Sequence, residues 1–201
     1  MLTRRLLSLS AVLFLYCGCD DAAAPRPIYD ASTRELVRLD VDTRGDGWID
    51  IRTYARGSRV MRTEIDADQD GRIDRWEYLA EGNQLAMLGT SSVAAGPEDT
   101  WTFRETGGEV RVDRLQRGEH SATRHEFYRA GVLMRAEEDT NGDGLMDKWE
   151  AYEGGRLRSL AFDSTRLAGQ PDRRLLYDES GQYASLEVDA NRDGQFERLN
   201  R

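Results

Sequence analysis

A short acidic stretch that contains glycine recurs along this chain at nearly constant spacing, and this repetition limits the folds that the chain can adopt. The stretch reads DADQDGRIDRWE at residues 66–77 and DTNGDGLMDKWE at residues 139–150. Related stretches begin at Asp42 and Asp189, so the four starting residues are 24, 73 and 50 residues apart. These separations are close to one, three and two multiples of a unit of about 24–25 residues, which indicates a repeat architecture. We therefore predict further units near residues 90, 115 and 163.

Each unit also contains the parts of a β-hairpin. Apolar residues precede the acidic stretch at alternate positions, as Leu160 and Phe162 do before Asp163. Aromatic segments such as RWEY and DKWEAY follow it, and each leads to a turn glycine, Gly82 or Gly154. Because Val, Ile, Tyr and Trp favour strands and alternate side chains share a face, we predict an all-β fold, an antiparallel meander of repeated hairpins. An open sheet, a barrel and a sandwich all satisfy this pattern.

The acidic stretches resemble the calcium loop of the EF-hand family. Calcium takes about 6–8 hard oxygen ligands, and alternate residues of a curled loop point inward. In the two most complete loops the resemblance implies Asp66, Asp68, Asp70, Arg72 through its carbonyl oxygen, Asp74 and Glu77, and then Asp139, Asn141, Asp143, Leu145 through its carbonyl oxygen, Asp147 and Glu150. Calcium is therefore the predicted cofactor, since magnesium demands a stricter octahedron and zinc prefers His or Cys.

The two helices of a true EF-hand do not fit between these loops. A twelve-residue loop leaves only about twelve residues before the next one, and glycine interrupts that segment. We therefore expect strands on both sides of each loop. The hairpins are similar to MORN-type repeats.

Two further loops depart from the calcium-loop pattern. The first retains Asp42, Asp46 and Asp50 but has Arg44 at its third position, where the guanidinium can replace the metal as counter-charge. The last retains Asp189, Asn191, Asp193 and Glu197. The alternative for all the loops is a solvated turn in which aspartate accepts backbone N–H bonds and no metal binds.

The first nineteen residues have the layout of a secretion signal. Arg4 and Arg5 precede an apolar run at residues 6–16, and Gly18 precedes Cys19. This layout resembles a bacterial lipoprotein signal, although Leu15 lies four residues before the cysteine instead of three. The resemblance implies a helical signal peptide at residues 1–18, lipid on Cys19, a tether at residues 19–28 and a repeat domain at residues 29–201. It also implies a lipid-anchored protein of the bacterial cell envelope, on the periplasmic face or the cell surface. An ordinary secretion signal is the alternative.

Charge and motifs narrow the classes of function. The net charge of −9 argues against nucleic acid as a partner, because phosphates require clusters of Lys and Arg. The sequence contains no HExxH motif, no nucleophile elbow and no cysteine after Cys19. We therefore expect a non-catalytic calcium-binding protein in which the metal is mainly structural, with calcium and a membrane as partners.

Two other functions remain as alternatives. One is an adhesion module that binds an envelope protein or a glycan through an aromatic stripe formed by Trp76, Tyr78, Trp149 and Tyr152. The other is a carboxylate-based hydrolase, because carboxylate catalysis requires no sequence motif. His120 and His125 are the only histidines, and we expect them to be surface residues without a catalytic or metal-binding role.

Overall fold

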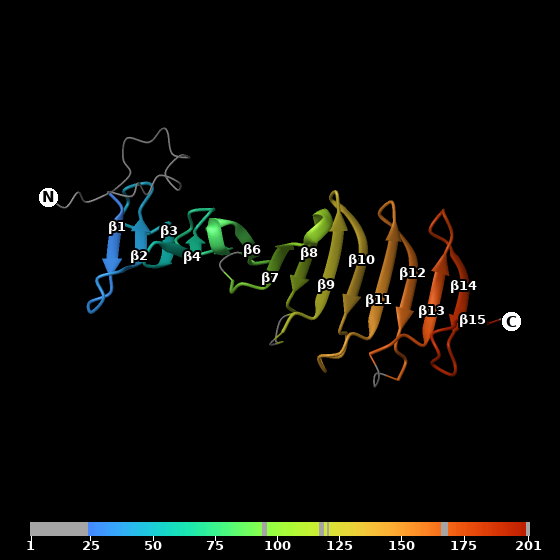
Figure 1. Ribbon diagram of the computed structural model, residues 1–201. Coiled ribbons are helices and arrows are strands. Elements are labelled where there is room, and N and C mark those ends of the chain that lie inside the picture. Colours follow the sequence, from blue (N-terminus) through green and yellow to red (C-terminus); the bar gives the residue numbers. More distant parts are fainter. Residues whose placement is uncertain (1–23, 94–95, 117–118, 120, 166–168, 200–201) are drawn as a thin grey trace.

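The computed structural model describes residues 24–93, 96–116, 119, 121–165 and 169–199. Within this part of the chain, fifteen strands form one sheet in which every strand pairs antiparallel with the next along the chain (Figure 1). The predicted all-β meander is therefore confirmed. The signal-peptide helix at residues 1–18 and Cys19 lie outside the described residues.

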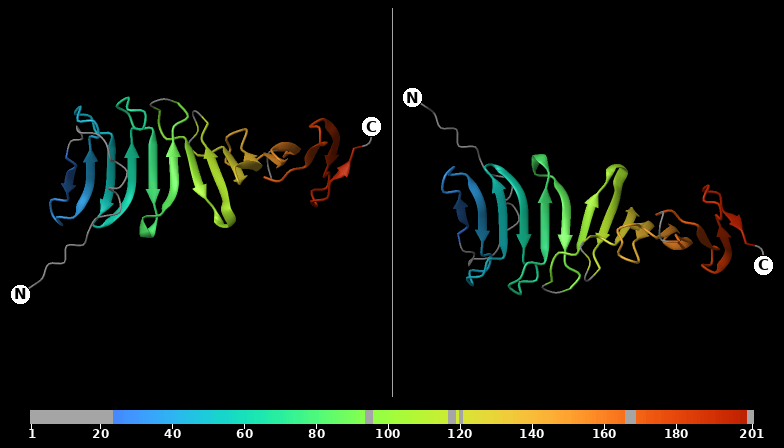
Figure 2. Two further views of the ribbon diagram at one scale, coloured as in Figure 1. Left: turned by 90° about the horizontal axis from the view of Figure 1, so that it is seen from above. Right: turned by 90° about the horizontal axis from the view of Figure 1, so that it is seen from below.

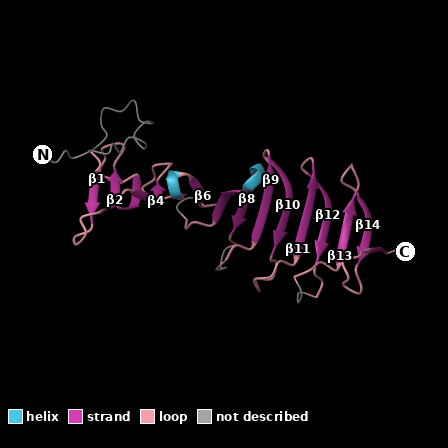
Figure 3. Ribbon diagram, viewed as in Figure 1, coloured by secondary structure: helices cyan, strands magenta, loops and turns pink. Residues whose placement is uncertain are grey.

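The strands and two short 3₁₀ helices follow one another without a crossover (Figure 3). They are β1 (Arg26–Tyr29), β2 (Leu36–Val41), β3 (Ile51–Arg56), β4 (Arg59–Ile65), β5 (Arg75–Leu79), η1 (Glu81–Asn83), β6 (Leu85–Thr90), β7 (Thr100–Arg104), η2 (Thr106–Gly108), β8 (Glu109–Arg114), β9 (Arg124–Arg129), β10 (Val132–Glu138), β11 (Lys148–Glu153), β12 (Arg156–Phe162), β13 (Arg173–Tyr177), β14 (Tyr183–Val188) and β15 (Glu197–Arg198). Strand β1 begins inside the segment that the sequence assigns to the tether.

The sheet is a single open layer. Strands β1 and β15 are at its two ends and lie far apart in the elongated ribbon (Figure 1). The ribbon twists along its length, so that Figure 1 shows β9–β14 broadside while Figure 2 shows β1–β8 broadside. Neither a closed barrel nor two packed sheets is formed by the described residues.

The three units that the spacing predicts are present. Long loops at residues 91–99, 115–123 and 163–172 connect β6 to β7, β8 to β9 and β12 to β13. They lie on the same edge of the sheet as the loops at residues 42–50, 66–74, 139–147 and 189–196, and we call this edge the loop edge. The repeat therefore continues through the units in which the acidic pattern has been lost.

Short turns connect the strands on the opposite edge. Gly154 and Gly155 form a two-residue turn with φ of 58° and 77°, and Ala130 and Gly131 form another with φ of 50° and 78°. Positive φ at both residues matches the twist of the flanking strands, which is why glycine is favoured there. Each of these two turns thus reverses the chain within two residues, and a register shift lies close to the turn in both hairpins.

The sheet has almost no apolar core. Among the described residues, only Ala136 and Ala161 are buried apolar side chains, whereas nine buried side chains are aspartates, seven of them on the loop edge. A single layer exposes both faces to water and cannot enclose a thick apolar interior. Rows of polar and aromatic side chains across the strands must therefore contribute much of the stability.

One face carries a row of alternating arginine and aromatic side chains, and we call it the tryptophan face because Trp76, Trp101 and Trp149 lie on it. Arg62 on β4 is directly opposite Tyr54 on β3 and Tyr78 on β5, and its guanidinium carbon lies 4.7 Å and 6.0 Å from the two ring centres. Arginines on β8 and β10 stack in the same way on phenylalanines, at 4.2 Å and 3.2 Å. Such cation–π contacts stabilise a half-exposed sheet by about 0.5–1 kcal/mol each.

The opposite face carries a network of ion pairs, and we call it the glutamate face. Arg124 on β9 donates at 2.7–3.0 Å to one glutamate on each of three adjacent strands, Glu126, Glu138 and Glu150. Lys148 pairs with Glu138 at 2.9 Å and with Glu150 at 2.8 Å. Because the network joins β9, β10 and β11, it holds three consecutive strands together without apolar packing.

Candidate metal site on the loop edge

The first and ninth residues of the loops extend the hydrogen-bond ladder of the sheet beyond the strands. The N–H of Asp66 donates to the carbonyl oxygen of Asp50 in the preceding loop at 2.8 Å, and Asp189 donates to Asp172 at 2.9 Å. The N–H of Asp74 donates to the carbonyl oxygen of Ile65 at 3.1 Å, which closes its own loop. The sheet thereby buries a row of aspartates along one edge, and seven of them are at most 6% exposed: Asp42, Asp50, Asp66, Asp139, Asp147, Asp163 and Asp189.

The first-position carboxylates are held by backbone N–H groups of their own loops. One oxygen of the aspartate accepts the N–H of the sixth-position glycine at 2.8 Å in the loops that begin at Asp42, Asp66, Asp139 and Asp189. Burial raises the pKa of Asp139, but the N–H groups of Gly144 and Gly142 outweigh it and the net pKa lies below its usual value. Backbone N–H groups likewise lower the pKa of Asp42, so these two carboxylates stay ionised, and all four aspartates shape their loops with or without a metal.

The ninth-position carboxylates usually bind the second residue of the loop. Asp147 accepts the N–H of Thr140 at 3.1 Å and its hydroxyl at 2.9 Å. The same pair of bonds joins Asp50 to Thr43 and, in a loop that is one residue longer, the tenth-position Asp172 to Ser164. A hydroxyl at the second position thus donates a hydrogen bond to the carboxylate, and this bond closes the loop.

The loop at residues 66–74 lacks this hydroxyl. Its second residue is Ala67, and one oxygen of Asp74 accepts only the N–H groups of Ala67 and Asp68, at 3.1 Å and 3.2 Å. One carboxylate oxygen from each of Asp66, Asp68 and Asp74 lies within 4.8 Å of the others, and this is the one such acidic group found in the described part of the chain. Carboxylate oxygens are hard ligands of the kind that calcium and magnesium take, so this group is the candidate metal site of the loop edge.

The crowding of these carboxylates has an electrostatic effect on Asp68. Partial desolvation by the surrounding loop first, and then repulsion by Asp70, Asp74 and Asp66, raise the pKa of this exposed carboxylate above the usual value, although a hydrogen bond from the N–H of Asp70 opposes them. A cation among these carboxylates would relieve the repulsion. The protein itself therefore leaves the negative charge of Asp68 incompletely compensated.

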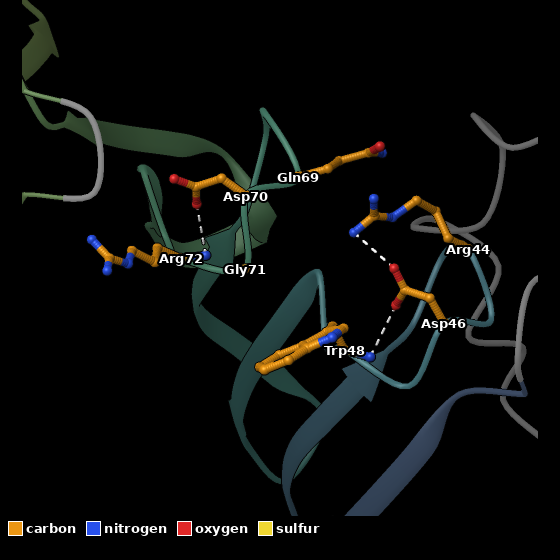
Figure 4. Close-up of a pocket in the computed structure, with 7 residues that line it drawn as sticks. All are labelled: Arg44, Asp46, Trp48, Gln69, Asp70, Gly71 and Arg72. Atoms are coloured by element: carbon orange, nitrogen blue, oxygen red, sulfur yellow. Dashed lines mark hydrogen bonds and ion pairs between the residues drawn. The ribbon is translucent and has the colours of Figure 1, made fainter.

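Arginine supplies the counter-charge in two other loops. Arg44 lies 3.0 Å from Asp46 (Figure 4), and it lies 3.5 Å from the buried Asp50. Arg192, in the last loop, reaches back to Asp163 of the preceding loop at 2.9 Å. A guanidinium at these places competes with a metal for the same carboxylates.

The predicted twelfth-position ligands do not lie in the loops. Glu77 is on β5 and pairs with Arg75 at 2.5 Å. Glu150 is on β11, where Arg124, Lys148 and Tyr152 lower its pKa to about 2 although burial raises it. The structure therefore does not bring these two glutamates together with the carboxylates of their loops.

Most of the other predicted ligands accept backbone N–H groups of their own loops. Asp70 lies outside the three-residue group, and its carboxylate accepts the N–H of Arg72 at 2.9 Å. Asn141 and Asp143 likewise accept backbone N–H groups at 2.8 Å, from Asp143 and Leu145. The side chains of Arg72 and Leu145 are exposed, which leaves their carbonyl oxygens as the only groups that could serve a metal.

In the last loop, Asn191 donates to Asp193 at 3.0 Å, and Asp193 accepts the N–H of Gln195 at 2.8 Å. Glu197, the predicted ninth-position ligand, is exposed on β15. Asp189 is thus the one predicted ligand of this loop that is buried.

The aromatic residues considered as a binding stripe are split between the two faces. Trp76, Tyr78 and Trp149 lie on the tryptophan face and are all partly buried. Tyr152 is on the glutamate face, where its hydroxyl donates to Glu150 at 2.8 Å. His125 pairs through Nδ1 with Asp113 at 2.6 Å on the tryptophan face, and His120 is outside the described residues.

Two groups of functional side chains were missed by the sequence analysis, although both leave a signal. A Ser or Thr directly follows the first position in the loops of Thr43, Ser92, Thr140 and Ser164. An arginine two residues before an acid recurs as RLD, RTE, RVD and RAE at residues 38–40, 62–64, 111–113 and 135–137, and each forms an ion pair. Both signals have the same period as the acidic loops.

Comparison with models of known protein families found none that matches this chain, and a search of curated proteins found no match either. None of the helices in the described residues is long and apolar enough to cross a membrane.

Proposed function

We propose that this protein is a lipid-anchored calcium-binding repeat protein of the bacterial envelope, with a non-catalytic, mainly structural role for the metal. The observation that carries the proposal is the group formed by Asp66, Asp68 and Asp74, whose oxygens lie within 4.8 Å of one another. Asp66 ends the ladder of β4 and Asp74 begins that of β5. An ion bound to both would clamp the bend between two strands.

The proposal ranks the loops by how their carboxylates are already used. Calcium binds first at residues 66–74, where Ala67 leaves Asp74 without a hydroxyl partner. In the loop at residues 139–147 an ion must compete with Thr140 for Asp147. In the loop at residues 42–50 the guanidinium of Arg44 already provides the positive charge.

The lipid anchor would attach the sheet by its loop edge. Strand β1 begins at Arg26, which is opposite Asp40 and therefore next to the first acidic loop. A tether from a lipidated Cys19 would join the sheet at that corner and hold the acidic loops near the membrane surface. Replacement of Cys19 by Ser should then abolish the incorporation of labelled fatty acid into the protein, and persistent labelling of that variant would contradict the anchor.

Thermal unfolding in calcium and in a chelator tests the metal. A ligand that binds only the folded state at a hundred times its dissociation constant adds about 2.7 kcal/mol to the free energy of unfolding. We expect calcium to raise the melting temperature more than magnesium does. An unchanged melting temperature at millimolar calcium, together with no heat of binding in calorimetric titration, would refute the proposal.

Two matched variants identify the site. Asp68→Asn removes one of the three converging carboxylates, and we expect it to weaken calcium binding by about tenfold or more. Glu77→Gln alters the twelfth position of the same loop, but Glu77 pairs with Arg75 on the sheet. We expect calcium binding to be unchanged in that control. A loss of binding in Glu77→Gln with none in Asp68→Asn would favour an ordinary EF-hand ligand set.

A further inference from the structure

The loops at residues 42–50 and 66–74 flank an open cleft of about 440 Å³, which none of the three converging carboxylates lines. Trp48 forms its floor, and Gln69 extends over it from the neighbouring loop (Figure 4). Arg44 and Asp46 form one wall, while the side chains of Asp70 and Arg72 extend away from the centre (Figure 4). The volume falls within the range of about 300–1,000 Å³ that is usual for small-molecule sites.

The exposed indole of Trp48 has no role in the acidic loop. The seventh position of such a loop contributes only its carbonyl oxygen, and Trp48 is 65% exposed. The edge of its ring lies against Gly71, with Cε3 4.0 Å from the place that a Cβ on this residue would occupy. This is no closer than an ordinary van der Waals contact, and with the indole 65% exposed most of the ring is free to contact a ligand.

Gln69 occupies a backbone position that favours glycine. The fourth residue of the loop has φ of 73° at Gly45 and 77° at Gly142, and φ is 65° at Gln69. Arg192 also adopts this conformation, but its side chain binds Asp163 of the preceding loop. A left-handed conformation costs a residue with a side chain about 1–2 kcal/mol. Such a strained position at the edge of a cleft points to a role for its side chain.

The charges of the cleft favour a neutral ligand. Arg44 and Asp46 form an ion pair at 3.0 Å, so this wall has no net charge. The Gln69 amide offers both a donor and an acceptor, Asp46 offers acceptors, and Arg44 offers donors. An aromatic platform combined with paired donors and acceptors suits a ring that has one apolar face and several hydroxyl groups.

We propose that this cleft binds a neutral pyranose unit of a glycan. The apolar face of the sugar ring stacks on Trp48, and its hydroxyl groups bind Gln69 and the Arg44–Asp46 pair. This inference goes beyond the proposed calcium-dependent scaffold, because none of Arg44, Asp46, Trp48 or Gln69 belongs to the three converging carboxylates.

Calorimetric titration of the purified full chain with cellotetraose and chitotetraose tests the inference, with tetragalacturonate as the acidic comparison. We expect saturable binding of a neutral oligosaccharide and about tenfold weaker binding in Trp48→Ala, because an aromatic stacking contact of this size is lost. Leu145→Ala is the matched control, since Leu145 is the exposed seventh residue of another loop. Binding in that variant should equal that of the unmodified protein.

Gln69→Gly separates a binding role from a structural one. Glycine relieves the left-handed strain, so we expect the melting temperature to be equal or higher while binding of the neutral oligosaccharide weakens several-fold. Failure of both neutral oligosaccharides to bind at millimolar concentration would overturn the inference, as would tighter binding of tetragalacturonate or unchanged binding in Trp48→Ala. The calcium-dependent shift of the melting temperature, measured on the same samples, reports the metal site separately.

Discussion

At the residue scale, the second position of each acidic loop determines how the ninth-position carboxylate is used. Thr140 satisfies both oxygens of Asp147, whereas Ala67 offers Asp74 only a backbone N–H. The two loops are therefore chemically different although both match the calcium-loop pattern in sequence. The difference depends on one hydroxyl group, so single substitutions at the second position can test it.

Exchange of these second residues should interchange the properties of the two loops. Ala67→Thr gives Asp74 a hydroxyl donor, so we expect a higher melting temperature in chelator and weaker calcium binding. Thr140→Ala removes a hydrogen bond from the buried Asp147, and we expect a loss of about 1–2 kcal/mol in the free energy of unfolding without calcium. Denaturant unfolding with and without calcium measures both effects. Equal calcium affinity in Ala67→Thr and the unmodified protein would contradict this account.

Arg44 offers a second test at the same scale. Its guanidinium is the counter-charge of Asp46 and of the buried Asp50, so Arg44→Asp removes that charge and adds a carboxylate. In chelator we expect the free energy of unfolding to fall by about 1–3 kcal/mol, because the buried Asp50 carboxylate loses its positive partner. We also expect one additional calcium ion per molecule in calorimetric titration. Arg34→Asp, at a turn on the opposite edge, is the charge-matched control and should leave the number of ions unchanged.

At the scale of strands, the network around Arg124 acts where another protein would have an apolar core. Arg124 is 20% exposed and bonds to glutamates on β9, β10 and β11. Replacement by Leu leaves Glu126, Glu138 and Glu150 without their shared cation. We expect the free energy of unfolding, measured with denaturant, to fall by roughly 3–5 kcal/mol, because three partly buried carboxylates then lack that partner. Arg129→Leu is the control, because this side chain on the same strand is exposed. It should lower the free energy of unfolding by less than about 0.5 kcal/mol.

The same network predicts an acid limit to stability. Arg124 and its neighbours hold the pKa of Glu150 at about 2 in the folded protein, against an ordinary value of 4.5. A lowered pKa in the folded state stabilises the protein above the ordinary pKa, and that stability is lost as the pH falls from about 4.5 to 2. Denaturant unfolding at a series of pH values measures how steeply the free energy of unfolding falls with pH. In Arg124→Gln this dependence on pH should be weaker. An equally steep slope in Arg124→Gln would assign the acid sensitivity to other groups.

At the scale of the whole molecule, each strand that the structure describes pairs only with its neighbours in the chain, and no element among the described residues bridges distant units. Stability in such an array is the sum of unit and neighbour terms, which resembles the behaviour of solenoid repeats. The sheet should therefore tolerate the loss of a complete unit. It should not tolerate the loss of half a unit, because antiparallel pairing then fails.

Deletion of residues 42–65 tests this expectation. It joins Val41 directly to Asp66 and brings β2 beside β5 with the direction and the alternation of the strands preserved. We expect circular dichroism to show an intact β-sheet and solution scattering to show a shorter particle. Deletion of residues 42–56 is the control, because it would require β2 and β4 to pair in parallel across a connection too short for a crossover. A folded product of the control deletion would contradict the meander.

The period of about 24–25 residues, the strands, the turns and the three degenerate units at residues 91–99, 115–123 and 163–172 were all predictable, because loop chemistry and side-chain alternation act over a few residues. The open single layer was not, since closure depends on twist accumulated over fifteen strands. Nor was the use of the carboxylates predictable: Glu150 joins an ion-pair network across three strands, and Arg192 neutralises Asp163 from another loop. Neighbours that far apart in the chain meet only when the sheet forms, and they determine which acidic residues are left for a cation.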